Sequence, residues 1–343
     1  MGAPTTNPEA EGVAVPEAPG IPGLRFRRFR GEDEYPAMID VFNRSMAADR
    51  AERVTTLEET ANLYRHFPNS DPERDLLMAE VHGQLVGYVR TTWREETEGD
   101  VIYKHWAALV QEWRGRGIGR AFLRHAERRL REVASMNASR AKRLFQAVVV
   151  DADRGALRLF STEGYAPVRY TFRMLRPTLE GLPEAPMPPG LEVRPAQPEH
   201  YRAIWEANVE AFRDHWGEGA RSEVDYERWL GEPTADPGLW QVAWDGDRVA
   251  GMVLNFINAS ENAESNRLRG HTEDICVRKP WRRRGLARAL IARSLRVLKE
   301  RGMSEAALSV DAENRSGALG LYESLGYRPA MRWTIFRKPL LKV

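Results

Sequence analysis

The chain has 343 residues, of which 42% are hydrophobic and 29% charged, and its formal net charge at pH 7 is +2. These proportions are typical of a soluble globular protein of about two domains, and no run approaches the roughly 18 apolar residues of a transmembrane helix. The near-neutral charge argues against nucleic acid as a partner, and the single cysteine, Cys276, excludes an intrachain disulfide and a cysteine metal cluster and predicts a reducing, cytoplasmic location.

The N-terminal residues 1–22 are rich in Ala, Pro, Gly and Glu and lack the basic start and apolar stretch of a secretory signal. We expect them to form a disordered tail. The alternating segment 24–27 then predicts a strand, and the apolar spacing of residues 35–46 predicts a helix after it. The folded part of the chain is therefore expected to begin near Leu24.

Four segments of the first half recur in the second half in the same order. They are a strand start, a hairpin with a Gly-containing turn, an Arg- and Gly-rich turn, and a segment that ends in Gly-Tyr, and the copies lie 162 to 168 positions apart. The pairs are 24–27 with 191–194, 78–88 with 242–252, 113–123 with 281–291, and 157–165 with 319–327. This repeat predicts two homologous domains.

The segment between the copies is rich in Pro and Gly and has no periodicity, which is typical of an interdomain linker. We therefore expect a first domain at residues 23–178, a linker at 179–190 and a second domain at 191–343. In each copy the predicted order is strand, helices, hairpin, strand, Gly-rich turn, helix, strand, short helix and final strand. That order predicts a mixed α/β domain in which helices pack on a central sheet.

Each copy contains one turn suited to binding phosphate. The strand-like segment 271–277 leads into the turn 282–287, and 101–110 leads into 114–119, with an amphipathic helix after each turn. Small residues let backbone N–H groups approach an anion, the helix N-terminus adds its positive dipole end, and arginine side chains add charge. Neither turn has the Gly-Lys-Ser/Thr of a Walker A loop or the G-x-G-x-x-G of a dinucleotide site.

The pattern Arg-x-x-Gly-x-Gly/Ala between a strand and a helix resembles the acetyl-CoA pyrophosphate loop of the GNAT family of N-acetyltransferases. The resemblance extends from about residue 24 to residue 339, and a second family motif follows in each copy. It implies acetyl-CoA as the cofactor. It also implies an α/β (α+β) fold of two tandem domains, each with a mixed, mostly antiparallel central sheet flanked by helices.

By this resemblance, cofactor binding belongs to the end of the strand, the turn and the start of the helix in each copy. In the second copy these residues, with an Asn farther on, are Ile275, Cys276, Val277, Arg282, Arg283, Arg284, Gly285, Leu286, Ala287, Arg288 and Asn314. In the first copy they are Leu109, Val110, Arg114, Arg116, Gly117, Ile118 and Gly119.

Acyl transfer from a thioester to an amine needs a deprotonated amine, stabilisation of the tetrahedral oxyanion and a proton for the leaving thiolate. The segment 310–327 resembles the GNAT segment in which an Asn contacts the cofactor and a Tyr eight residues later protonates the sulfur; these are Asn314 and Tyr322. A tyrosine, with a reference pKa of about 10, keeps its proton at neutral pH. The resemblance further implies that backbone N–H groups of residues 275–277 bind the oxyanion.

Strand alternation selects the candidate bases. Counting back from Val277, Glu273 and His271 fall on the same face of the strand. Asp274 falls on the other face. Because GNAT enzymes often place their base on this strand face, Glu273 is the first candidate and His271 the second, although Glu273 could instead orient the substrate. Cys276, flanked by apolar residues, is expected to be a core residue and not a nucleophile.

The first copy departs from the family pattern in its catalytic segment. Phe160 aligns with Tyr322, and a phenyl ring has no proton to give. Ala152 stands where the Asn of the motif would be, whereas His105 stands at the position that matches Glu273. We therefore expect the first copy to bind CoA weakly or structurally and to take no part in catalysis.

The expected activity is an N-acetyltransferase in which the second copy moves an acetyl group from acetyl-CoA to a primary amine of a small molecule by direct attack. Residues 214–216 are candidate substrate contacts, with a surface loop as the stronger alternative. A non-catalytic CoA-binding regulatory module and the acylation of a protein or peptide amine remain open. A nucleic-acid binder that uses the arginines around residue 282 is disfavoured by the net charge. We expect a monomer or homodimer without nucleic-acid or membrane partners.

Overall fold

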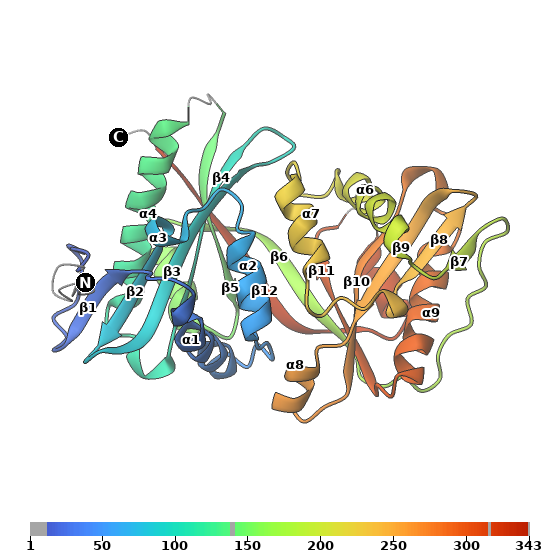
Figure 1. Ribbon diagram of the computed structural model, residues 1–343, viewed down its shortest axis with the longest axis horizontal. Helices are drawn as coiled ribbons and strands as arrows, with labels where there is room; N and C mark the ends of the chain where they lie inside the picture. The colour runs from blue at the N-terminus through green and yellow to red at the C-terminus, as the bar shows by residue number, and fades with distance from the viewer. Residues whose placement is uncertain (1–11, 138–140, 315–316, 342–343) are drawn as a thin grey trace, which may run out of the picture. The chain divides into compact units, whose positions relative to one another are not determined.

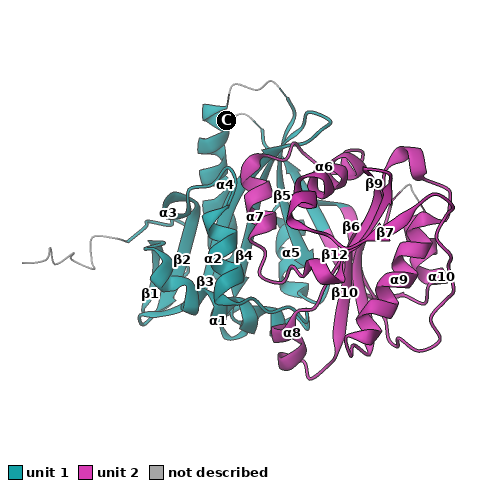
Figure 2. Ribbon diagram, turned by 45° about the vertical axis from the view of Figure 1, so that its right-hand side comes forward, with its two compact units in different colours: residues 1–168, 335–343 teal, residues 169–334 magenta. Residues whose placement is uncertain are grey.

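The computed structural model describes residues 12–137, 141–314 and 317–341. The chain divides into two compact units, which are residues 1–168 with 335–343 (unit 1) and residues 169–334 (unit 2; Figure 2). Each unit is built on a sheet with helices packed on it (Figure 1). The predicted α/β class with two domains is confirmed.

Unit 1 has a sheet in the order β1-β2-β3-β4-β5, with residues of β12 beyond β5. The pairs from β1 to β4 are antiparallel, and β4 and β5 run parallel. In chain order its elements are β1 (Leu24–Arg28), α1 (Tyr35–Ala48), α2 (Leu57–Arg65), α3 (Pro72–Asp75), β2 (Leu76–Val81), β3 (Gln84–Glu95), β4 (Val101–Leu109), α4 (Ile118–Met136), β5 (Arg143–Val150), α5 (Arg154–Thr162) and the start of β6 (Ala166–Arg176).

Unit 2 repeats this order of elements with two differences: the helix α3 precedes β2 in unit 1, and the helix α8 lies between β9 and β10 in unit 2. Its sheet runs β7-β8-β9-β10-β11-β6. Here β10 and β11 are the parallel pair. Its elements are β7 (Glu192–Arg194), α6 (Tyr201–Phe212), α7 (Glu223–Leu230), β8 (Gln241–Asp245), β9 (Arg248–Phe256), α8 (Ala259–Glu264), β10 (Arg269–Val277), α9 (Leu286–Glu300), β11 (Glu305–Asp311), α10 (Ala318–Ser324) and most of β12 (Arg328–Pro339).

Helices cover both faces of each sheet. In unit 1, a Cβ at Gly87 would lie 2.8 Å from Cδ1 of Leu109 and 3.1 Å from Cε2 of Phe122, so this face of the sheet is turned toward α4. On the other face, Trp106 contacts Phe42 of α1, with 5.6 Å between the ring centroids. A Cβ at Gly87 would lie 2.8 Å from the carbonyl oxygen of Ala108, so the close approach of β3 to β4 requires glycine there. In unit 2, α9 and α6 take the corresponding places on β9 and β10.

The last strand of each repeat extends into the other compact unit. Residues 169–176 of β6 belong to unit 2, where β6 pairs antiparallel with β11. Residues 335–343 belong to unit 1, where Arg337 Nε donates to Gln146 Oε1 of β5 at 2.8 Å. The limits of the compact units therefore differ from the expected domain limits, because the two end strands, 11 and 12 residues long, continue beyond their own repeats.

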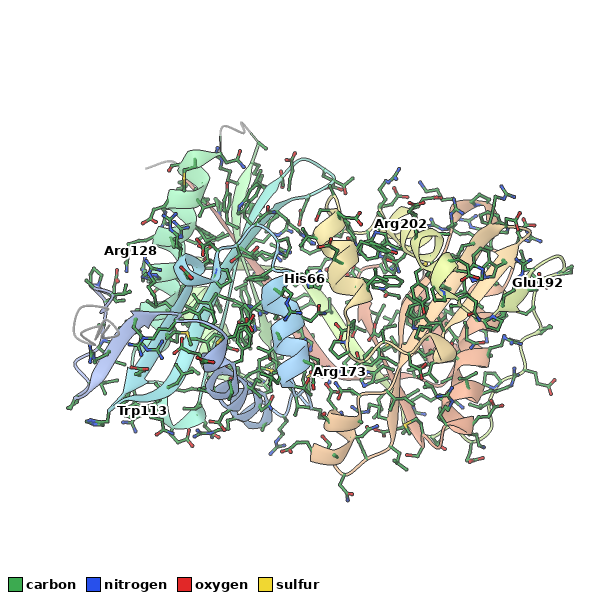
Figure 3. The ribbon with its side chains drawn as sticks, viewed as in Figure 1. His66, Trp113, Arg128, Arg173, Glu192 and Arg202 are labelled. Carbon is green, nitrogen blue, oxygen red and sulfur yellow. The ribbon has the colours of Figure 1, made fainter. Side chains whose placement is uncertain are left out.

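Residues 12–22, which we expected to belong to a disordered tail, pack against unit 1. The side chain of Val15 is 7% exposed within the hydrophobic core, and Glu17 accepts a hydrogen bond from Arg128 of α4 (Figure 3) at 2.6 Å. One buried apolar side chain and one paired charge thus order a segment whose composition suggested disorder. Residues 1–11 lie outside the described residues.

The predicted linker also packs on its unit. Leu179 is 2% exposed, and its N–H donates to the carbonyl oxygen of Ser304 at 2.9 Å. Glu180 forms an ion pair with Lys299 of α9 at 2.6 Å. The segment has no regular structure, as its composition predicted, yet it is bound along the surface of unit 2.

No helix in the described parts of the chain is both long and apolar enough to cross a bilayer. The longest of them, α4, has 19 residues, but arginines and glutamates recur along it. Its pattern is that of an amphipathic helix that lies on a sheet.

Arg337→Ala should destabilise unit 1. The Arg337 guanidinium pairs with Glu96, and the two side chains are 9% and 6% exposed. Removing the cation leaves a buried carboxylate unpaired, so we expect the free energy of unfolding to fall by about 3 kcal/mol or more. Urea titration followed by circular dichroism measures this change. The control is Arg301→Ala at the exposed pair with Asp236, for which a loss below about 1 kcal/mol is expected. Equal losses would contradict a structural role for β12 in unit 1.

Candidate active site

The candidate site lies where two parallel strands part. In the described chain, β10 and β11 pair only along residues 269–271, although β10 continues to Val277. In unit 1, β4 and β5 pair along residues 101–104 and then part in the same way. Beyond these points the inner strand has lost its parallel neighbour, so its backbone groups on that side are available to a ligand.

β10 contains a β-bulge that the sequence analysis did not predict. The register of β10 against β9 shifts between Glu273 and Cys276, and Asp274 has a φ of 49°, in the left-handed region. Glu273 and Cys276 pair with Leu254 and Met252, which belong to one core cluster under α6. The inserted residue therefore places Glu273 and Cys276 on the same face of the sheet.

The bulge overturns part of the predicted alternation. Glu273 and His271 share a face, but it is the face of Cys276 and not that of Val277, which packs toward α9. The prediction that both candidate bases lie on the face of Val277 is wrong, because one inserted residue shifts the alternation by one position. Cys276 is 7% exposed, and burial raises the pKa of its thiol.

Glu273 is half-buried at the start of the bulge and accepts a hydrogen bond from the hydroxyl of Ser309 on β11. Burial raises the pKa of Glu273 to about 8, and the negative charge of Asp274 adds to the rise. The hydrogen bond from Ser309 and the positive charge of the Arg173 guanidinium (Figure 3) lower this pKa and so offset part of the rise. A carboxyl group with a pKa close to neutral can accept a proton from a substrate and release it again.

His271 is 5% exposed and is held between two side chains. The ring of Phe256 stacks on it with 4.5 Å between centroids, and Glu261 Oε2 lies 3.4 Å from its Nε2. Burial lowers the pKa of His271, although the charge of Glu261 opposes this shift. His271 is thus fixed in the interior, whereas Glu273 lies where the strands part.

Tyr322 lies on α10 and is 6% exposed within the core cluster that also contains Leu286 of α9. Burial raises the pKa of Tyr322, and the charge of Glu273 raises it further, so the phenol keeps its proton throughout the neutral range. The neighbouring Tyr327 differs, because its hydroxyl is engaged with Thr272 Oγ1 at 2.8 Å.

The predicted phosphate turn of unit 2 has the shape of an anion site. Gly285 is the N-cap of α9 with a φ of 84°, and no described side chain caps the helix. A Cβ at Gly285 would meet no described atom within 4 Å, so the space in front of the turn is open. The first N–H groups of α9, which have no partners within the helix, therefore point toward accessible space at its positive end.

Arginines of this turn and of the start of α9 form hydrogen bonds with the protein itself. Arg282 donates from Nε to the carbonyl oxygen of Val277 at 2.9 Å and from Nη2 to that of Ala211 at 3.3 Å. Arg288 donates to Ser324 Oγ at 2.6 Å. These bonds hold the turn against the end of β10 and against α10, so the arginines shape the site as well as adding positive charge to it.

Unit 1 contains the same turn. Gly117 is the N-cap of α4 with a φ of 95°. Arg114 Nε donates to the carbonyl oxygen of Leu109 at 3.0 Å, which matches the bond from Arg282 to Val277. The two copies thus share the turn, the arginine that fixes it and the parting of the parallel strands.

β4 of unit 1 has no bulge and pairs with β3 in unbroken register along its whole described length. His105 therefore points to the α4 side of the sheet, where its Nε2 lies 2.9 Å from the hydroxyl of Tyr165. In unit 2 the corresponding Tyr327 contacts Thr272. His105 thus takes the place of Thr272 in space, and its predicted match with Glu273 is wrong because only β10 has the inserted residue.

Aromatic rings fill the corresponding region of unit 1. Phe160 stacks on His105 and on Phe336, with 5.7 Å between centroids in both pairs. Burial lowers the pKa of His105 to about 4, so its imidazole is neutral at pH 7. Phe160, which aligns with Tyr322, is therefore part of an aromatic core.

The other predicted residues lie at the ends of unit 2 elements. Asn314 precedes α10, and its N–H donates to the carbonyl oxygen of Asp311 at 3.1 Å. Asp214 forms an exposed ion pair with Lys279 at 2.7 Å. The loop 214–216 thus joins the segment that precedes the phosphate turn.

Neither the bulge at Asp274 nor the positions of Ser309 and Tyr327 beside the site were predicted from the sequence. The signal for the bulge is the pair of consecutive carboxylates in a strand that is otherwise suited to burial, since simple alternation would point them to opposite faces. Ser309 and Tyr327 have no local signal, because their positions depend on the pairing of distant segments.

Comparison with known proteins identifies the family and agrees with the fold. Residues 37–165 and 201–327 match the Acetyltransferase (GNAT) family. The mycothiol acetyltransferase of Streptomyces bingchenggensis is 32% identical over 297 residues, which cover 84% of this chain and 88% of that protein. The GCN5-related N-acetyltransferase of Sphaerobacter thermophilus has a TM-score of 0.68 and 27% identity, over 93% of this chain and 96% of that chain.

A tandem GNAT protein from the clavulanic acid biosynthesis pathway has the same fold, with a TM-score of 0.65 and 16% identity over 93% of this chain and 99% of that one. Two family matches in one chain explain the internal repeat and the two copies of the Gly-rich turn. The chain belongs to the GNAT family and is a tandem N-acetyltransferase that uses acetyl-CoA as its acetyl donor.

Proposed function

We propose that unit 2 acetylates a primary amine of a small molecule by direct attack of the amine on the thioester of acetyl-CoA, with Glu273 as general base and Tyr322 as general acid. The observation that carries this proposal is that Glu273, at the parting of β10 and β11, is close enough to Tyr322 for its charge to raise the pKa of the phenol. Tyr322 also shares its core cluster with Leu286, the residue that follows Gly285, so we assign both groups to one site beside the predicted anion-binding turn. The relatives named mycothiol acetyltransferase support a small-molecule acceptor.

The turn and helix of unit 2 fit the pyrophosphate of acetyl-CoA, which supplies an acetyl group activated as a thioester. Backbone N–H groups of Leu286, Ala287 and Arg288 would bind the pyrophosphate, since α9 begins with an uncapped first turn among the described residues. Gly285 keeps the approach open. Asn314, at the turn before α10, would contact the cofactor nearer its thiol end.

Glu273 would remove the proton from the acceptor nitrogen, directly or through water. Its ionised carboxylate is the form that acts as a base. Because the pKa of Glu273 is about 8, this carboxylate binds a proton more strongly than an ordinary glutamate does, which suits the removal of a proton from the amine. His271 is the second candidate, but its ring is stacked on Phe256 and paired with Glu261. Glu273 is therefore assigned the role.

Two further groups would complete the transfer. Backbone N–H groups of residues 275–277 would bind the carbonyl oxygen as negative charge develops on it, because β11 does not pair with this part of β10. Tyr322 would give its proton to the sulfur as the carbon–sulfur bond breaks. The raised pKa of Tyr322 keeps that proton in place until then.

Unit 1 is assigned no catalytic step. In the place of Tyr322 it has Phe160, and the ring of Phe160 is packed between His105 and Phe336. His105 is buried, neutral and engaged with Tyr165. The two units therefore share a fold and differ in chemistry.

The rate of acetyl transfer should rise with pH and level off above about 8, because only the ionised form of Glu273 acts as the base. Glu273→Gln should lower kcat/KM by about 10²- to 10⁴-fold and abolish this rise. Asp274→Asn should move the rise to lower pH, since removing the adjacent negative charge lowers the pKa of Glu273. Thiol release from acetyl-CoA with a panel of primary amines measures these profiles. An unchanged rise in both variants would assign the base to another residue.

Tyr322→Phe should lower kcat by about 10²- to 10⁴-fold, because the leaving thiolate loses its proton donor. The matched control is Phe160→Leu at the aligned position of unit 1. That variant should lose about 1 kcal/mol of stability through the lost ring contacts and should keep kcat within about twofold. Comparable losses of kcat would contradict the division of roles between the units.

Gly285→Val should abolish the binding of coenzyme A, because a side chain would project into the open space where the pyrophosphate is expected. Gly302→Val is the matched control, since Gly302 has a φ of 81° and its Cβ would also meet no described atom within 4 Å. Both variants should lose stability by about 1–2 kcal/mol through the strained backbone. Isothermal titration calorimetry should show lost binding only for Gly285→Val. Full binding by that variant would refute the assigned pyrophosphate site.

A further inference from the structure

The turns of the two units differ in what lies in front of them. A Cβ at Gly117 would lie 3.1 Å from Cβ and 3.4 Å from Cγ of Pro19, whereas a Cβ at Gly285 would meet no described atom within 4 Å. Both glycines are left-handed N-caps of the long helix that follows the turn, so the two positions are directly comparable. The ring of Pro19 therefore occupies, in unit 1, the space that is open in unit 2.

Backbone and apolar contacts hold this segment in place. Val13 N donates to the carbonyl oxygen of Phe26 at 2.8 Å, so residue 13 lies beside the edge strand β1 and pairs with it. Val15 is 7% exposed and is part of the unit 1 core. Ala18 N then donates to the carbonyl oxygen of Val15 at 2.9 Å, and this turn directs Pro19 toward α4.

An ion pair attaches the segment to the helix that begins at the turn. Arg128 Nη1 of α4 lies 2.6 Å and 2.8 Å from the two carboxylate oxygens of Glu17, and this hydrogen bond lowers the pKa of Glu17 (Arg128 in Figure 3). Glu17 and Pro19 are two residues apart and both lie against α4. The segment is thus bound to the helix by a charge and covers its N-terminal end with an apolar ring.

We infer that residues 12–21 occupy the acyl-CoA site of unit 1, so that the full chain binds a single coenzyme A, in unit 2. A pyrophosphate must reach the N–H groups that follow Gly117, and the Pro19 ring lies against this glycine. The ring excludes the anion and has no N–H with which to bind it. Unit 1 retains the turn of the family, and its own N-terminal segment fills it.

This inference concerns binding and is tested without turnover. Coenzyme A is titrated calorimetrically into the full chain, into a chain that begins at residue 23, and into the full-length double variant Val15→Ser/Glu17→Lys. The double variant keeps the chain length, removes the apolar anchor and replaces the attraction to Arg128 with repulsion. We expect one site in the full chain and a second, weaker site in both released forms.

Two glycine variants identify the second site. In the released forms, Gly117→Val should remove the second site and Gly285→Val should remove only the first. Two sites in the full chain would overturn the inference, and so would a single site in both released forms when circular dichroism shows them folded.

Hydrogen exchange provides an independent readout on the full chain. Saturating coenzyme A should slow amide exchange in the residues after Gly285 and leave the residues after Gly117 unchanged. Protection at both turns would contradict an occupied unit 1 site. Because neither experiment involves an amine substrate, failure here is distinguishable from failure of the proposed catalytic roles.

Discussion

The candidate site depends on one inserted residue, Asp274, in the strand β10. A bulge with a left-handed residue bends the strand and interrupts its ladder, which is how sheets commonly redirect side chains near functional sites. In this chain it places Glu273 on the α6 side of the sheet, next to Ser309 and beside the negative charge of Asp274. The raised pKa of Glu273 follows from that placement, since burial and an adjacent carboxylate both disfavour ionisation.

Comparing the two units distinguishes the features that belong to the shared fold from those that only the proposed catalytic unit has. Both units keep the parting strands, the left-handed glycine and the arginine that holds the turn to the strand. Among the described residues, unit 2 alone has a bulge in the inner strand that parts from its neighbour, a tyrosine on the helix after the last inner strand, and open space before its glycine. In unit 1 aromatic rings and Pro19 occupy the equivalent places. The fold can therefore be conserved between copies while the reactive groups are replaced by packing.

Sequence patterns predicted the features that depend on neighbouring residues. The Gly-rich turn at Gly285 and the helix after it have local signals. The duplication of the fold was predicted from the internal repeat, and the structure contains all three features. The face of Glu273 could not be predicted, because a bulge is defined by pairing with another strand. The same holds for Val15 and for the end strands, whose partners are distant in sequence. Composition predicted disorder for the segment around Val15, and it carried no information about what that segment or the end strands contact.

The central claim is that Tyr322 protonates the departing thiolate in a site whose pyrophosphate cradle is the turn at Gly285. A crystal structure of the chain with coenzyme A tests this claim most directly. The account predicts electron density for one cofactor in unit 2, with its pyrophosphate on the N–H groups at the start of α9 and its sulfur within hydrogen-bonding distance of the Tyr322 hydroxyl. A cofactor bound in unit 1 alone, or a sulfur that points away from Tyr322, would contradict it.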